Sequence, residues 1–196
     1  MKTVFFDIDT QIDFLYPAGA LYVPGAECIL PGVAGLNRFA AAHGIPVIST
    51  TDAHSEDDPE FRSWPPHCVV ETPGQRKPAA TLLENRIVVP NRACEFSVEG
   101  ARQTVVEKQT LDVFDTRNIG RLLERLGADM YVVYGVAAEI CVKRAALGLL
   151  KTGKPVILIT DAVKGIDRGD CARALEEFQA AGGSLGTIGE ICESLP

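Results

Sequence analysis

The most constraining feature of this 196-residue chain is the alternation of short apolar, β-branched runs with segments of helical periodicity. Such alternation indicates βαβ units, whose right-handed crossovers build a mostly parallel sheet with helices packed on it. We predict strands at residues 3–8, 45–50, 86–89, 104–106, 130–134, 155–160 and 184–187. The sequence therefore predicts an α/β fold, in which ligands bind at the carboxyl ends of the strands.

The segments between these strands predict four helices and one long loop. Helices are expected at 30–43, 116–126, 138–150 and from Asp167 or Asp170 to 181, and Thr116 can cap the second of them. Residues 15–29 are predicted to be a loop, and residues 52–85 a polar, proline-rich connection without periodicity. Because so long a connection is usually functional, we expect one domain over 1–196 with a loop excursion at about 52–85.

Composition narrows the classes of partner and compartment. The chain has 19 Lys and Arg against 26 Asp and Glu, a net charge of −7 that disfavours nucleic acid and anionic membranes. No window approaches the roughly 20 apolar residues of a membrane span, and acidic residues within the first seven positions argue against a signal peptide. Six widely spaced cysteines without a C-x-x-C pair indicate reduced thiols, so we expect a cytoplasmic protein.

Reactive side chains stand at or just after the ends of four predicted strands. They are Asp7 and Asp9, Asp52 and His54, Lys108, and Cys141. Because the carboxyl ends of parallel strands share one edge of the sheet, these groups can converge on one pocket. This pattern is our main evidence from the residues for an enzyme.

Cys141 is the candidate nucleophile. A thiol in the first turn of a helix lies near the positive end of the helix dipole and near free N–H groups, which lower its pKa and can hold an oxyanion. His43 is predicted inside a helix away from the strand ends, so Asp9 remains as the base, kept ionised by Lys108. The alternatives are an inert core cysteine, an aspartate that caps a turn, and a surface lysine.

Residues 52–67 have the character of a metal site. Asp52 and His54 alternate along an extended segment, and His67 follows in the same loop. Imidazole and carboxylate ligands suit a divalent Zn, Fe or Mn ion, and Glu60 is a candidate fourth ligand. The alternative is that both histidines form hydrogen bonds in a polar loop. The other acidic residues of 56–60 are predicted to form a solvated face.

Two aromatic residues are candidate walls for a flat ligand. Trp64 is the only tryptophan and lies in a segment stiffened by two prolines, and Phe14 follows the first strand. The alternative for both is simple packing in the core.

Taken together, these motifs resemble the isochorismatase-like cysteine hydrolases, and most closely their nicotinamidase-related branch. The resemblance covers about residues 4–187 and is carried by DTQIDF from Asp9, DAH from Asp52, SWPPH from Ser63, Lys108, and GVAAEIC from Gly135. It implies a three-layer αβα fold with a mostly parallel six-stranded sheet. It also implies a small-molecule amide substrate, nicotinamide first, a divalent metal ion, and a homo-oligomer, either a dimer or a tetramer.

The resemblance also implies a role for each matching residue. Asp9, Lys108 and Cys141 match the family's catalytic triad, and the N–H groups of Ala137 and Cys141 match its oxyanion hole, after a cis peptide between Val136 and Ala137. Asp52, His54 and His67 match its metal ligands, with Glu60 by spacing at the fourth position. Phe14 and Trp64 match the aromatic walls of its substrate site.

The chain departs from nicotinamidases at two places near the implied pocket. QTLDVF follows Lys108 where a Ser-Ala-Phe-like stretch is common, and Ala138 replaces a hydroxyl residue. Two alternatives therefore stand beside nicotinamide hydrolysis. One is an amidase for another small amide or an N-carbamoyl compound, and the other is a non-catalytic metal- or small-molecule-binding relative.

Overall fold

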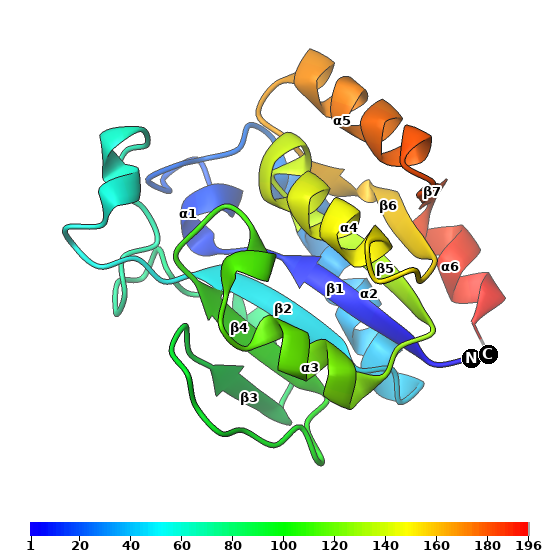
Figure 1. Ribbon diagram of the computed structural model, residues 1–196. Coiled ribbons are helices and arrows are strands. Elements are labelled where there is room, and N and C mark those ends of the chain that lie inside the picture. Colours follow the sequence, from blue (N-terminus) through cyan, green and yellow to red (C-terminus); the bar gives the residue numbers. More distant parts are fainter. Residues whose placement is uncertain (196) are drawn as a thin grey trace.

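A seven-stranded parallel sheet runs through the centre of the protein in the computed structural model, which describes residues 1–195. The strand order is β3-β4-β2-β1-β5-β6-β7, and every neighbouring pair is parallel (Figure 1). The strands are β1 (Thr3–Ile8), β2 (Val47–Asp52), β3 (Arg86–Val89), β4 (Gln103–Lys108), β5 (Met130–Val136), β6 (Val156–Lys164) and β7 (Ser184–Gly186). The predicted parallel α/β fold is confirmed.

The six strands that the resemblance implies are one too few, because the short strand β7 joins the sheet. It adds three residues to one edge by pairing with β6, from Ile157 opposite Ser184 to Ile159 opposite Gly186.

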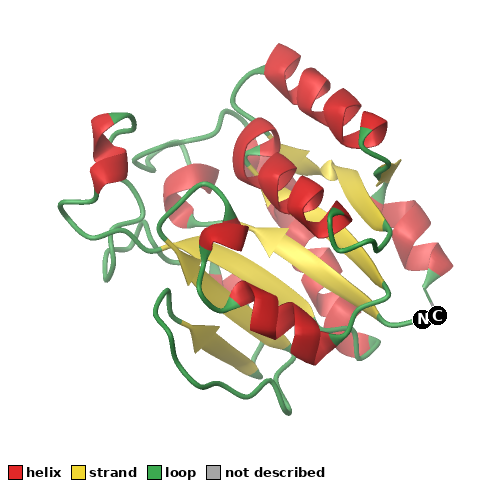
Figure 2. Ribbon diagram, viewed as in Figure 1, coloured by secondary structure: helices red, strands yellow, loops and turns green. Residues whose placement is uncertain are grey.

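Helices cover both faces of the sheet, so the protein has three layers (Figure 2). The α-helices are α1 (Ile12–Leu15), α2 (Leu30–Ala42), α3 (Ile119–Leu126), α4 (Lys143–Leu150), α5 (Arg168–Ala180) and α6 (Ile188–Ser194). In Figure 1, α3, α4 and α5 lie in front of the sheet, and α2 and α6 lie behind it. Among residues 1–195, no helix combines the length and apolar character needed to cross a membrane.

The central strands are buried along their whole length. Every residue of β1, β2 and β5 is buried, as expected for parallel strands with helices on both faces. Alternate side chains enter opposite cores: Phe5 packs with α2, and Phe6 packs with α3 and α4. Burying each such side chain contributes about 1.5–3 kcal/mol. The cores therefore hold the carboxyl ends of these strands in fixed relative positions.

A polar network also lies inside the protein, on the α2 side of β1. The Asp7 carboxylate is fully buried, and its Oδ2 lies 3.1 Å from Lys77 Nζ. Asn37 and Ser49 each donate a hydrogen bond to the same oxygen at 3.1 Å, and Thr10 donates to Oδ1 at 2.7 Å. The network fastens the loop that contains Lys77 to the first strand.

Several element boundaries differ from the predictions. Strands β2 and β4 each extend to the functional residue, because Asp52 and Lys108 are register partners at the end of their ladder. Helix α3 begins at Ile119 rather than Thr116, whose hydroxyl instead donates to Val113 O at 2.7 Å.

Two further helices bear on the predictions. The sequence analysis does not predict helix α6, although Thr187 and Glu190 form a capping box at its start. Of the two predicted starts of α5, Asp167 is the correct one, because its side chain accepts from the N–H groups of Gly169 and Asp170.

Candidate active site

The chain reverses direction sharply between β5 and the residue Cys141. Gly135 has φ +124°, and a Cβ at this position would lie 2.1 Å from Ile8 O, so only glycine fits. The next peptide, Val136–Ala137, is cis, in agreement with the resemblance. A π-helical turn, η5 (Ala138–Val142), then leads into α4 and carries Cys141 beside the ends of β1 and β4.

Lys108 brings the predicted triad together. Its Nζ lies 2.9 Å from Asp9 Oδ2 and 3.8 Å from Cys141 Sγ, and it also contacts the Asp52 carboxylate. It donates a further hydrogen bond to Thr110 O at 3.0 Å. Three segments that are remote in the sequence thus place an ammonium, a carboxylate and a thiol in one small volume. The alternative of a surface lysine is wrong, since the Lys108 side chain is buried.

The surroundings keep Lys108 charged and leave one oxygen of Asp9 available. Burial alone lowers the pKa of Lys108, but the carboxylates of Asp52 and Asp9 outweigh it and raise that pKa well above its usual value. Asp9 Oδ1 accepts a hydrogen bond of 2.5 Å from Thr50 Oγ1. Within the described residues 1–195, Asp9 Oδ2 has no hydrogen-bond partner beyond its ion pair with Lys108. This oxygen is therefore free to accept a proton.

The Cys141 thiol is held in its neutral form. Burial raises its pKa well above the usual value, Lys108 lowers it, and the negative charge of the Asp9 carboxylate raises it again. The expected lowering by the helix terminus is thus wrong for the free protein, because burial dominates. A thiol of this kind needs a base at the moment of attack.

The predicted metal ligands also meet. Asp52, His54 and His67 are buried, and one ligand atom from each lies within 4.8 Å of the others. The Nε2 atom of each histidine lies 4.0 Å from Asp52 Oδ2. Glu60 lies at the edge of this group, with Oε1 3.9 Å from His67 Nε2, and outside the three-residue cluster.

The second ring nitrogen of each histidine lies beside an oxygen atom. His54 Nδ1 lies 3.0 Å from Asp58 Oδ2, a contact without hydrogen-bond geometry, and His67 Nδ1 lies within a hydrogen-bond distance of 2.8 Å from Pro65 O. The prediction of a solvated face at 56–60 is wrong for Asp58, which is buried. A carboxylate behind a ligating histidine fixes the ring and its tautomer. The spacing of four residues from His54 was the signal that could have found Asp58.

These residues fit a divalent cation. His54 Nε2 is buried and has no hydrogen-bond partner among residues 1–195, which is costly unless a ligand uses its lone pair. Burial also raises the pKa of Asp52 to about 7, against the opposing effect of Lys108. Two imidazoles and a carboxylate are a common donor set for Zn, Fe or Mn.

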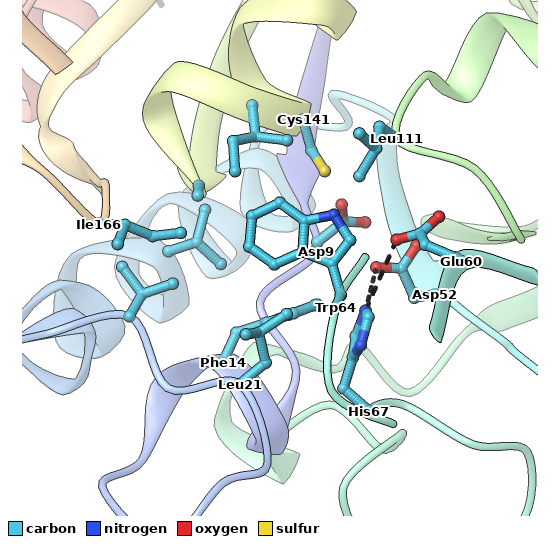
Figure 3. A pocket seen from close by; sticks show the side chains of 14 residues that line it. Asp9, Phe14, Leu21, Asp52, Glu60, Trp64, His67, Leu111, Cys141 and Ile166 are labelled. Atoms are coloured by element: carbon cyan, nitrogen blue, oxygen red, sulfur yellow. Dashed lines mark ion pairs between the residues drawn. The ribbon is translucent and has the colours of Figure 1, made fainter. Parts of the chain in front are cut away.

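A small cavity opens beside the thiol (Figure 3). Its lining includes Asp9 and Cys141, Asp52, Glu60 and His67, and both predicted aromatic walls, Phe14 and Trp64. Phe14 also belongs to the core on the α2 side, so the packing alternative holds for part of its surface.

The sequence did not single out five of the apolar residues in the lining. They are Leu21, Val23, Leu111, Ile140 and Ile166. Val136 and Ala137, the two residues of the expected cis peptide, line the cavity as well. Of the two departures from nicotinamidases, one reaches the cavity, because Leu111 belongs to the QTLDVF stretch after Lys108. The other, Ala138, is not among the described residues that line it. No lysine or arginine belongs to the lining within the described part of the chain. The walls therefore suit an uncharged, flat molecule.

The fold and this site define an isochorismatase-type hydrolase. The family model for the isochorismatase domain matches residues 3–190, so the chain belongs to that family. The nicotinamidase of Escherichia coli is 27% identical over 212 residues, covering 93% of each chain. The crystal structure of the pyrazinamidase of Pyrococcus horikoshii in complex with zinc has a TM-score of 0.82 at 31% identity. That match covers 95% of this chain and 99% of the other.

A further relative is named for a different activity. The N-carbamoylsarcosine amidase of an Arthrobacter species is 26% identical over 171 residues, which is 81% of this chain and 60% of that protein.

Proposed function

We propose that this protein is a metal-containing cysteine amidohydrolase that converts nicotinamide to nicotinate and ammonia. The family and the relatives make the chain a hydrolase of non-peptide C–N bonds. What we propose beyond this class is the particular substrate, nicotinamide. The observation that carries the proposal is Lys108, which lies 2.9 Å from Asp9 and 3.8 Å from Cys141 beside a cavity that Phe14 and Trp64 also line.

The reaction begins with proton transfer from Cys141 to Asp9. The sulfur attacks the carboxamide carbon, and the carbonyl oxygen becomes an oxyanion. This oxyanion accepts hydrogen bonds from the backbone N–H groups of Ala137 and Cys141. Asp9 returns the proton to the nitrogen, the C–N bond breaks, and ammonia leaves a thioester. Asp9 then takes a proton from water, whose oxygen attacks the thioester. The C–S bond breaks, and the leaving sulfur takes the proton from Asp9, which restores the thiol and the Asp9 carboxylate. Nicotinic acid leaves and loses its carboxyl proton to solvent as nicotinate.

Lys108 supports these steps by its charge. Its ammonium holds Asp9 in the ionised form between proton transfers and stabilises the sulfur anion at 3.8 Å while it forms. The thiol need not be ionised beforehand, because Asp9 Oδ2 is available as the acceptor. The pairing of a carboxylate with an ammonium thus replaces the histidine that usually activates a cysteine.

Asp52, His54 and His67 would hold the metal ion, with Glu60 at the edge of the same group. When bound, the divalent ion supplies a Lewis acid that can engage a pyridine-type ring nitrogen or water. The residues of this chain orient the ring between Phe14 and Trp64.

The absence of cationic side chains in the described lining favours nicotinamide over N-carbamoylsarcosine. The latter carries a carboxylate, and the apolar end of the described lining, away from the metal-ligand cluster, holds no charged partner for it. Lys108 does not supply the partner, because it already faces the carboxylates of Asp9 and Asp52.

Ammonia release tests the proposal. The metal-containing wild type is assayed with nicotinamide and with N-carbamoylsarcosine, beside Cys141→Ala and the control Cys192→Ala, whose cysteine lies in α6. We expect nicotinate and ammonia in equal amounts from wild type and the control, and a loss of at least about 1,000-fold in Cys141→Ala. Absence of turnover in wild type, or full turnover in Cys141→Ala, would contradict the mechanism.

A panel of small amides with ammonia detection separates an amidase for another substrate from a non-catalytic binder. A protein that releases ammonia from none of these amides is a binder.

A further inference from the structure

One end of the cavity is apolar and lies away from the metal-ligand cluster. In Figure 3, Asp52, Glu60 and His67 lie on one side of Trp64 and Asp9, and Ile166 lies on the other. A flat ring whose polar edge faces the cluster would therefore present its opposite edge to Ile166.

Ile166 is an unusual wall residue. It belongs to the loop between β6 and α5 and is 41% exposed, although it lines the cavity. Only a few large apolar side chains are this exposed among residues 1–195, and Ile166 is the one that lines the cavity. When a ligand covers apolar surface that was exposed beside a cavity, the removal of that surface from water stabilises the complex.

Glu139 fixes the position of this wall. Its Oε1 accepts hydrogen bonds from the backbone N–H of Ile166 at 2.8 Å and of Asp167 at 3.0 Å. Its Oε2 accepts from the Cys171 thiol at 3.6 Å. A Cβ on Gly165 would lie 2.1 Å from Glu139 Oε2, which shows how closely the loop packs on this carboxylate. Glu139 precedes Cys141 by two residues in η5, so one turn carries both the nucleophile and the anchor of the wall.

We propose that Ile166 is a specificity-determining residue that contacts a small apolar substituent on ring carbon 5 of a nicotinamide-type substrate, and that Glu139 is its positioning residue. The inference rests on the proposed function, because the ring is oriented by its carboxamide at Cys141 and its nitrogen at the metal cluster. The substrate class is thereby extended from nicotinamide to neutral aromatic carboxamides with a short alkyl group at that carbon. A charged group at the same carbon is excluded, since the described lining holds no lysine or arginine.

Binding to Cys141→Ala, purified with its metal, tests this inference without turnover. Calorimetry gives the dissociation constants of nicotinamide and 5-methylnicotinamide, and their ratio is the readout. We expect the methyl compound to bind about fourfold tighter, the value for burying one methyl-sized group. The ratio should fall to about one in Cys141→Ala/Ile166→Ala and remain near four in Cys141→Ala/Ile166→Val.

Two variants of Glu139 test its role as the positioning residue in the same background. Glu139→Ala should lower the ratio toward one, because the loop loses both anchoring hydrogen bonds. Glu139→Gln should retain it, because an amide oxygen can accept from both N–H groups. A general loss of protein stability would weaken the binding of both ligands alike and leave the ratio of their dissociation constants unchanged.

The outcomes separate the two proposals. If nicotinamide binds but the methyl group has no effect or weakens binding, the inference about Ile166 fails alone. An unchanged ratio in the Ile166→Ala variant also overturns it. If Glu139→Ala leaves the ratio near four, the positioning role fails. If neither amide binds, the proposed function fails and the inference fails with it.

Discussion

Replacing Lys77 by methionine is expected to destabilise the protein without affecting catalysis. The Asp7 carboxylate is fully buried, and the Lys77 ammonium at 3.1 Å is its charged partner. Methionine has a similar shape but leaves that carboxylate unpaired, and removing one partner of a buried ion pair costs about 3–5 kcal/mol. The hydrogen bonds from Thr10, Asn37 and Ser49 remain, so we expect a value near the lower end.

Urea unfolding followed by circular dichroism measures this effect. With a slope of about 2–3 kcal/mol per molar urea, the midpoint should fall by about 1–2 M. The double variant Asp7→Asn/Lys77→Met removes the unpaired charge and should recover most of the loss. The turnover number should stay within about twofold of wild type, because neither residue lines the cavity.

Two results would refute this reasoning. A midpoint shift below about 0.3 M would mean that the buried pair contributes little, as exposed pairs do. A double variant no more stable than Lys77→Met would mean that the unpaired charge is not the cause of the loss.

Three further variants or modifications probe other parts of the molecule. Lys108→Met should lower kcat at least about 100-fold with the fold retained by circular dichroism, and a loss below tenfold would contradict the role of Lys108 beside Asp9. Gly74→Ala should lower the thermal midpoint by about 3–10 °C, because the added Cβ would lie 2.2 Å from both Asp13 carboxylate oxygens; an unchanged midpoint counts against this clash. Burial, together with a nearby glutamate, raises the pKa of Cys171 to about 11, so its alkylation should accelerate about tenfold per pH unit from pH 8 to 10. A rate that levels off below pH 9 in mass-spectrometric mapping would contradict this direction.

The architecture was largely predictable because its signals are local. Continuous apolar runs indicated strands buried on both faces, and helical periodicity indicated the crossovers between them. The start of α5 was narrowed to Asp167 or Asp170 for the same reason, since a cap acts on N–H groups two and three residues away, and Asp167 is the cap. The exceptions were helix α6 and strand β7's place in the sheet, short elements whose stability comes from packing at the sheet edge.

The candidate site was predictable as a set of residues but not as an arrangement. The sequence placed Asp9, Lys108 and Cys141 at strand ends, and parallel strands bring such ends to one edge. It did not reveal that Asp52 and Lys108 are register partners, or that Lys108 faces two carboxylates. Register depends on the side chains that neighbouring strands bury, which no single segment specifies.

The protonation state of the Cys141 thiol also depends on features that the sequence shows and on features that only the tertiary structure shows. A helix terminus, visible in the sequence, favours the thiolate, yet burial and the Asp9 carboxylate raise the pKa of Cys141. The loop of Ile166 and its anchor Glu139 likewise meet only after folding.

The sequence by itself thus determined the order of strands and helices and the chemical groups available, because periodicity and side-chain type are properties of short segments. Only the tertiary structure decided which groups touch, which are desolvated and which wall each presents to a ligand. Those outcomes depend on distances between residues far apart in the chain, and packing alone sets such distances.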